Sequence, residues 1–125
     1  MKIAVTAAGE TIDSGIDPRF GRASGFIIFD TSDGNFTYLG NQVMMESVQG
    51  AGIQTARNVI DSGAKKVITG NVGPKAFATL NAAGIEIYTG ANGTVKDALE
   101  ELKKGTLGKT ESANVSGHWH EKEAL

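Results

Sequence analysis

The second half of the chain alternates helical and strand-like patterns, and this alternation restricts the fold more than any other feature. Two short runs, Lys66–Thr69 and Ile85–Tyr88, each follow a segment in which apolar residues recur at helical spacing. Two strands joined through a helix in one sheet form a parallel, right-handed crossover. We therefore predict an α/β fold. The expected helices begin near Gly50, Pro74 and Thr94 and end at Gly63, Gly84 and Gly105.

The first forty residues contain three further strand-like runs, at Lys2–Ala7, Phe26–Asp30 and Asn35–Leu39. Asp33 and Gly34 lie between the last two runs, and an Asp-Gly pair in this position is the strongest short signal of a hairpin. We expect these three strands to form an antiparallel meander that precedes the crossovers.

This order of elements puts several strand ends at one edge of the sheet. If the second strand is antiparallel to the first, the first, third, fourth and fifth strands end together. The segments that leave this edge are Ala8–Gly25, Gly40–Gly52, Gly70–Pro74 and Gly90–Thr94. They hold 11 of the 17 glycines, at positions 9, 15, 21, 25, 40, 50, 52, 70, 73, 90 and 93. Open α/β sheets bind ligands at the carboxyl edge of parallel strands, so a site is expected here.

Length and composition restrict the class of protein. The 125 residues are expected to form one domain over residues 1–105 and a mobile tail over residues 106–125, where apolar residues become sparse. A formal net charge of −2 argues against nucleic-acid binding. No membrane-spanning run and no signal-peptide pattern occurs, so we expect a cytoplasmic protein. The absence of cysteine excludes disulfides, thiolate nucleophiles and cysteine-ligated metal clusters.

Two segments at the glycine-rich edge carry candidate anion-binding groups. The arginines of Asp17-Pro18-Arg19-Phe20-Gly21-Arg22 could bind an oxyanion or a thio anion, or an ion pair with the aspartate could order the loop. Gly70-Asn71-Val72-Gly73-Pro74-Lys75 offers helix N-terminal N–H groups and a lysine, although its glycines also suit a tight turn. Gly50 and Gly52 either let a ligand approach the backbone or only make a flexible helix entry.

Catalytic motifs have little support. His118 and His120 occur in the tail as His-Trp-His and could bind a transition metal, but two imidazoles are an incomplete site, and a solvated tail is the simpler interpretation. The chain has no Gly-x-Ser-x-Gly motif and no readable Ser-His-Asp arrangement. We therefore do not expect an enzyme.

Several segments together resemble a known family. They are Met1-Lys2-Ile3-Ala4-Val5, Asp17-Pro18-Arg19-Phe20-Gly21-Arg22-Ala23, Gly50-Ala51-Gly52-Ile53-Gln54, Val67–Phe77 and Ala83-Gly84-Ile85. The chain is similar to the small single-domain members of the dinitrogenase iron–molybdenum cofactor biosynthesis family, which are related to the cofactor-carrier proteins of nitrogenase assembly. The resemblance covers about residues 1–105. It implies a ribonuclease-H-like fold, with a five-stranded mixed sheet in the order 3-2-1-4-5, strand 2 antiparallel, and helices on both faces.

The resemblance also implies a non-catalytic carrier. Its cargo would be an anionic metal–sulfur cluster, or a precursor, of molybdenum, iron or copper with sulfide, and its partners would be metallocluster assembly proteins. Cofactor-carrying members often have histidine immediately before the Phe-Gly of the first loop. This chain has Arg19 there, which can pair with a cluster's charge but cannot ligate a metal. The expected cargo-binding residues are Arg19, Phe20, Gly21, Arg22, Asn41, Gly50, Gly52, Asn71, Gly73 and Lys75.

Two other functions compete with the carrier. Ribonuclease-H-like nucleases hold two magnesium ions with carboxylates on central strands. This chain has Thr6 on the first strand, and Asp30 is alone at the end of the second. The alternative function is a metal-free regulatory or interaction module that binds a small anion at the same edge or docks on an iron–sulfur assembly ATPase.

Overall fold

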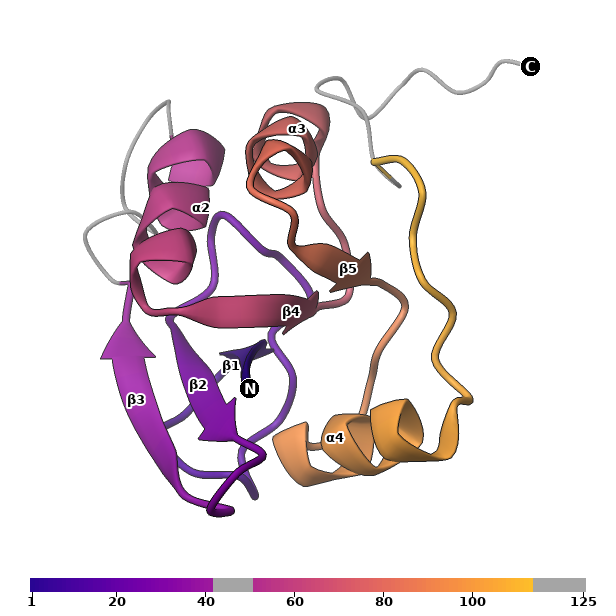
Figure 1. Ribbon diagram of the computed structural model, residues 1–125. Helices are drawn as coiled ribbons and strands as arrows, with labels where there is room; N and C mark the ends of the chain where they lie inside the picture. Colours follow the sequence, from indigo (N-terminus) through magenta and orange to yellow (C-terminus); the bar gives the residue numbers. More distant parts are fainter. Residues whose placement is uncertain (42–50, 114–125) are drawn as a thin grey trace.

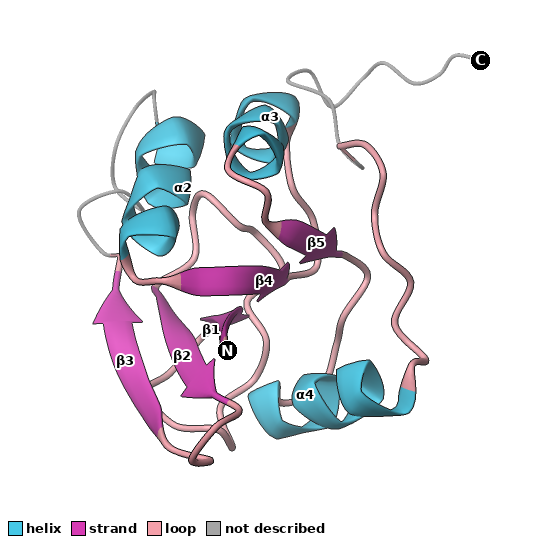
Figure 2. Ribbon diagram, viewed as in Figure 1, coloured by secondary structure: helices cyan, strands magenta, loops and turns pink. Residues whose placement is uncertain are grey.

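The strands form one mixed sheet, with helices packed on both of its faces (Figures 1 and 2). The computed structural model describes residues 1–41 and 51–113. The sheet order is β3-β2-β1-β4-β5, with β1 antiparallel to β2 and parallel to β4, which confirms the predicted fold. In chain order the elements of the described residues are β1 (Lys2–Ala7), β2 (Gly25–Asp30), β3 (Phe36–Gly40), α2 (Ala51–Asp61), β4 (Ala64–Ile68), α3 (Pro74–Ala82), β5 (Glu86–Tyr88) and α4 (Val95–Lys104).

Local signals in the sequence set the ends of the elements. At the start of α4, the side chain of Thr94 accepts a hydrogen bond from the backbone N–H of Asp97, and the Asp97 carboxylate accepts one from the N–H of Thr94, both at 3.1 Å. This capping box satisfies two N–H groups that have no partner within the helix. Gly105 ends α4 in the left-handed conformation, with φ of 78°, which only glycine adopts at little cost.

The turn between β2 and β3 is the hairpin that Asp33 and Gly34 predict. Gly34 has a φ of 75°, and its N–H donates to the carbonyl of Asp30 at 2.9 Å. The Asp30 carboxylate accepts hydrogen bonds from the hydroxyl of Ser32 at 2.6 Å and from its N–H at 2.9 Å. These bonds to the ionised form hold the pKa of Asp30 below its ordinary value.

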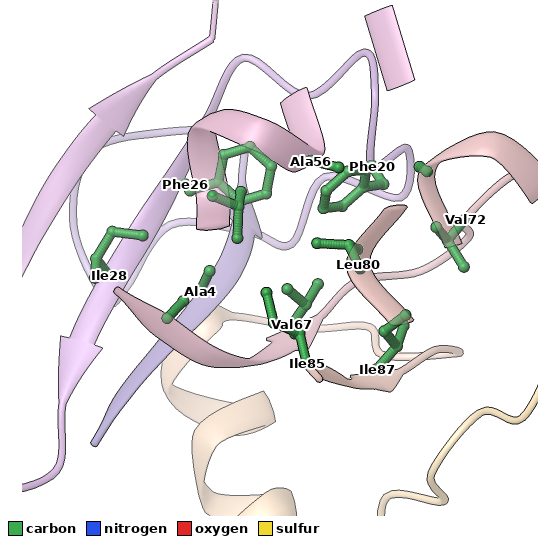
Figure 3. Close-up of a cluster of buried hydrophobic side chains, with 13 residues drawn as sticks. Ala4, Phe20, Phe26, Ile28, Ala56, Val67, Val72, Leu80, Ile85 and Ile87 are labelled. Carbon is green, nitrogen blue, oxygen red and sulfur yellow. The ribbon is translucent and has the colours of Figure 1, made fainter. Parts of the chain in front are cut away.

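Two separate layers of apolar side chains cover the two faces of the sheet. Neighbouring residues of β1 point to opposite faces, so Ala4 belongs to one layer and Ile3 and Val5 belong to the other. The first layer lies beneath α2 and α3, and Figure 3 shows Phe20 and Leu80 within it. The second lies beneath α4, which covers its face of the sheet alone among the described helices (Figure 2).

The segment of residues 106–113 lies along the edge of β5 that is not paired with β4. Lys109 forms an antiparallel bridge with Tyr88, and the N–H of Thr110 donates to the carbonyl of Ile87 at 2.7 Å. The hydrogen-bonded chain thus continues past the domain boundary expected at residue 105. The Thr110 hydroxyl adds to this attachment, since it accepts a hydrogen bond from the N–H of Thr89 at 3.1 Å and lies 2.7 Å from the Thr89 hydroxyl. Such bonds leave no apolar period in the sequence.

Candidate anion-binding site at the carboxyl edge of the sheet

The first loop, residues 8–24, crosses the edge of the sheet where the parallel strands end. It pairs there with segments that follow β5 and β4, because Gly15 bridges to Thr94 and Arg19 bridges to Asn71. The loops that leave β1, β4 and β5 are therefore in contact with one another. Their convergence at this edge follows from the strand order that the sequence predicts.

Asp17 anchors the middle of this loop. Its side chain is 8% exposed, and its carboxylate accepts hydrogen bonds from the N–H groups of Arg19 at 3.0 Å and Ser24 at 3.4 Å. Its backbone is tied to β1, since the hydroxyl of Thr6 donates to the carbonyl of Asp17 at 2.7 Å. The Nε of Arg19 lies 3.5 Å from the same carboxylate. The ion pair considered for this loop is therefore present, but it is long.

The two segments with candidate anion-binding groups contact each other directly. The N–H of Phe20 donates to the carbonyl of Asn71 at 3.1 Å, and the side-chain amide of Asn71 donates to the carbonyl of Pro18 at 3.1 Å. A Cβ atom added to Gly70 would lie 2.8 Å from the Cα of Pro18. The glycine at position 70 is thus required by the close passage of the first loop.

The first loop also contacts the beginning of α2. A Cβ atom on Gly21 would lie 3.1 Å from the Cα of Gly52. Below this contact, the fully buried hydroxyl of Thr55 lies 3.4 Å from the carbonyl of Gly21 and 3.2 Å from the side-chain oxygen of Asn41. The amide of Asn41 donates to the carbonyl of Ala23 at 2.9 Å. Sequence reasoning missed Thr55, because it appears there only as a polar residue on the apolar face of a helix.

The groups exposed around this junction suit a negatively charged ligand. The Arg19 side chain is 58% exposed, and Lys75 is exposed in the first turn of α3. Gly73 precedes that helix and provides no side-chain cap, and neither α2 nor α3 has an acidic residue in its first turn. The partial positive charge of both helix N-termini is therefore not neutralised by a carboxylate of the same turn. Arg22 is half-buried in the same loop.

Two of the expected cargo-binding residues hold the loop in place. Phe20 is 2% exposed, and its ring meets the ring of Phe26 edge-on at 5.4 Å between centroids, inside the first apolar layer (Figure 3). Asn41 is 5% exposed, and both ends of its amide are hydrogen-bonded within the protein. Their side chains therefore fix the position of the arginines. Gly50, His118 and His120 lie outside the described residues, so their predicted roles in binding remain predictions.

The sequence model of the dinitrogenase iron–molybdenum cofactor family matches residues 1–105, which include both loop segments and all described strands and helices. The chain belongs to this family. The matched region ends at Gly105, the residue that caps α4.

Two similar proteins with solved structures have the same fold, and one further protein is similar in sequence. The apo form of the orange protein from Desulfovibrio gigas is 40% identical, with a TM-score of 0.88, over 90% of this chain and 95% of that one. A Thermotoga protein of the DUF35 family, provisionally named a NifB protein, is 32% identical, with a TM-score of 0.78, over 90% and 97% of the two chains. An uncharacterised protein of Methanocaldococcus jannaschii is 25% identical over 89% of this chain and 97% of its own length.

Within this family fold, the positions considered for a nuclease site are far apart. The hydroxyl of Thr6 is buried and lies 3.0 Å from that of Thr69, near the carboxyl end of β1. Asp30 pairs with Lys2 at the opposite end of the same strand, so Thr6 and Asp30 cannot belong to one metal site. Across residues 1–41 and 51–113, no three His, Cys, Asp or Glu side chains are grouped to hold a metal ion. In the same residues, no helix is long and apolar enough to cross a membrane.

Proposed function

We propose that this protein binds an anionic metal–sulfur cluster, or its precursor, at the carboxyl edge of the sheet and transfers it to a metallocluster assembly protein without catalysing a reaction. The observation that carries the proposal is the junction of the Asp17–Arg22 loop with the N-termini of α2 and α3, through the Arg19–Asn71 bridge and the Gly21–Gly52 contact. Membership of a family named for an iron–molybdenum cofactor supports a cofactor-binding or carrier role.

The donor groups at this junction fit an anionic cargo better than a bare metal ion. The chain has no cysteine, and its described residues hold no group of three metal-ligating side chains. A guanidinium and helix N–H groups bind an anion through charge and hydrogen bonds, and the sulfides of a metal–sulfur cluster accept such bonds. Arg19 is suited to this task because its side chain is largely exposed and its bond to Asp17 is long. Its guanidinium can therefore turn toward a ligand.

A similar protein of known structure supports a binding role. The structure of the Desulfovibrio gigas orange protein is of its apo form, which indicates that the orange protein also has a form with a bound group. The orange protein is 40% identical to this chain, and the match covers 90% of this chain. The arrangement that we assign to binding lies within the region that the family model matches.

Anaerobic uptake of tetrathiomolybdate, alone and with Cu(I), tests the proposal. After gel filtration the protein is expected to retain molybdenum, measured by plasma mass spectrometry, and to show sulfide-to-metal charge-transfer bands in the visible spectrum. Arg19→Gln is expected to lower the retained metal, because it removes the exposed guanidinium. Arg57→Gln provides the matched control, since Arg57 is exposed on α2 and outside the loop junction. A His118→Ala/His120→Ala double variant measures what the tail imidazoles contribute.

Two results would overturn the carrier function. One is the absence of retained metal from any thiomolybdate mixture, with or without copper or iron. The other is equal retention by Arg19→Gln and the wild type. A parallel titration with molybdate, which has no sulfide, distinguishes the carrier from the metal-free anion-binding module. Such a module would bind the plain oxyanion as tightly as the thio anion.

A further inference from the structure

The face of the sheet that carries α4, opposite the face covered by α2 and α3, contains a second concave site. One helix is roughly 10 Å wide and neighbouring strands are about 4.8 Å apart, so a single helix covers about two strands. Between α4 and the strands β1 and β2 a cavity of about 590 Å³ therefore remains. Of the residues that line it, only Ile12 lies in the first loop, and none is among the candidate anion-binding residues.

The floor of this cavity is apolar. Ile3 of β1 is buried and Met1 is exposed, whereas four other apolar residues that line the cavity are half-buried, so part of their hydrocarbon surface faces the open space. These half-buried residues are Ile12, Phe29, Leu99 and Leu102. An acyl chain that covered them would remove this surface from water, which is favourable in proportion to the area buried.

The rim of the cavity carries positive charge. Lys66, Lys96 and Lys103 line it, against one lining carboxylate, that of Glu100. The ammonium of Lys66 is already paired, because it lies 3.5 Å from the carboxylate of Glu86. Lys96 and Lys103 are exposed, and in the described part of the chain neither has a carboxylate within 4.0 Å. Both ammonium groups can therefore pair with an anionic ligand.

An apolar floor beside ammonium groups that have no carboxylate partner among residues 1–41 and 51–113 matches a ligand with an acyl chain and an anionic head. We propose that this cavity binds a medium-chain fatty acid, with its chain over Leu99, Leu102 and Phe29 and its carboxylate at Lys96 and Lys103. The volume lies within the range of small-molecule sites, roughly 300–1,000 Å³. A small oxyanion would leave the apolar floor uncovered, and a cationic amphiphile would meet charges of the same sign.

Calorimetric titration of the full-length protein with decanoate, below its micelle concentration, tests this site. Decanoate is expected to bind at one site per chain. Decyltrimethylammonium, which has the same chain and the opposite charge, is expected to bind at least about tenfold more weakly. Butyrate, which has the charge but little of the chain, is expected to show no binding in the same range. Methyl NMR signals of Leu99 and Leu102 should shift on addition of decanoate.

Charge-reversal variants locate the head group. Lys96→Glu/Lys103→Glu is expected to weaken decanoate binding about tenfold or more and to make the cationic amphiphile the preferred ligand. Lys65→Glu/Lys104→Glu is the matched control, because these lysines are exposed but do not line the cavity. If the reversed variant fails to fold, Lys96→Gln/Lys103→Gln replaces it, with an expected loss of about two- to fivefold for each lysine.

Three results would overturn the proposal. They are no decanoate binding, equal affinity for decanoate and decyltrimethylammonium, and NMR shifts confined to residues outside the cavity. The proposal is independent of the carrier function, because Arg19→Gln is expected to leave decanoate affinity unchanged while it lowers metal uptake. A negative result for decanoate binding therefore does not affect the test of metal uptake, and the reverse also holds.

Discussion

The backbone of Gly21, in the first loop, lies against that of Gly52, the second residue of α2, so closely that a Cβ on Gly21 would be 3.1 Å from the Cα and 3.2 Å from the N of Gly52. Few real Cβ atoms come this close to another heavy atom, so any larger residue at position 21 must displace the loop from the helix. The contact thus sets the distance between the arginines of the loop and the N-terminus of α2.

Gly21→Ala is therefore expected to lower both stability and metal uptake. Moving the loop should reduce the free energy of unfolding by about 1–2 kcal/mol, as overpacking does elsewhere, and should weaken retention of tetrathiomolybdate. Urea unfolding and the uptake assay measure the two effects. Gly52→Ala is the control, because its Cβ would meet that of Ala76 at an ordinary 3.4 Å and alanine favours the helix. It should unfold no more easily than the wild type, and the prediction fails if the two variants are equally destabilised.

A second pair of glycine variants tests the passage of the first loop over the end of β4. In Gly70→Ala the new Cβ would lie 2.8 Å from the Cα and 2.9 Å from the carbonyl oxygen of Pro18. We expect a loss of about 1–3 kcal/mol in the free energy of unfolding, measured by urea denaturation. Gly73→Ala has no heavy atom within 4 Å of its Cβ and should cost less than about 1 kcal/mol. Equal losses for both variants would contradict this account of the loop.

The buried hydroxyl of Thr55 gives a third prediction. Thr55→Val keeps the shape of the side chain but removes the hydroxyl that faces the side-chain oxygen of Asn41 and the carbonyl of Gly21. The Gly21 carbonyl keeps the Asn41 amide as a donor at 3.5 Å, but the buried Asn41 oxygen loses the Thr55 hydroxyl, which should cost about 1–3 kcal/mol of stability. Thr79→Val removes the hydroxyl bonded to the carbonyl of Lys75 on the exposed side of α3 and should cost less than about 1 kcal/mol. Thermal unfolding of the two variants compares them directly.

The hydrogen bond from the hydroxyl of Tyr88 to the carboxylate of Glu86, at 2.8 Å, gives a prediction about pH. This bond is the largest of the effects that hold the pKa of Glu86 below its ordinary value, with Lys66 a smaller contributor and burial acting in the opposite direction. Tyr88→Phe should therefore raise the pKa of Glu86 more than Lys66→Gln does. Carboxyl carbon NMR titration measures both shifts, and a larger effect of Lys66→Gln would contradict the assignment.

The same bond makes stability depend on acid in a definite direction. Because the pKa of Glu86 is lowered on folding, its stabilisation is present above the pKa of the unfolded chain and is lost as the pH falls through the folded pKa. The difference in unfolding free energy between wild type and Tyr88→Phe should therefore narrow as the pH is lowered. Burial, together with the bond to Glu86, raises the pKa of Tyr88. The stabilisation from protonated Tyr88 is therefore present below the ordinary tyrosine pKa and is lost as the pH rises through the folded pKa.

Much of the architecture follows from patterns within short stretches of the sequence. The capping box of Thr94 and Asp97, the hairpin glycine Gly34 and the proline that opens α3 each act over a few residues, and each is visible without a structure. The parallel crossovers then leave few possible sheet orders. The carboxyl edge, and the presence of the Arg19 and Asn71 segments along it, could be located from this order, whereas the bridge between the two residues appears only in the structure.

The remaining features depend on contacts between distant residues. Phe20 lies between two arginines in a polar loop, and only the packed structure reveals that its ring belongs to the core. The attachment of Thr110 to β5 combines a backbone hydrogen bond with bonds between its hydroxyl and Thr89, and a single threonine outside any periodic pattern does not indicate such a partner. The cavity beneath α4 arises because one helix is too narrow for the sheet, and no single segment of the sequence records that mismatch.

The central position of β1 has a consequence for synthesis on the ribosome. One edge of this strand pairs with β2, whose Asp30 is opposite Lys2, so this pairing joins residues close in the sequence. The other edge pairs with β4, which begins only at Ala64. The meander can assemble as soon as the first forty residues emerge, but it then displays an unpaired apolar strand while the next segment is translated. Such open edges recruit other chains, and parallel pairings across long separations form slowly. We expect this interval to be when the nascent chain most needs a chaperone.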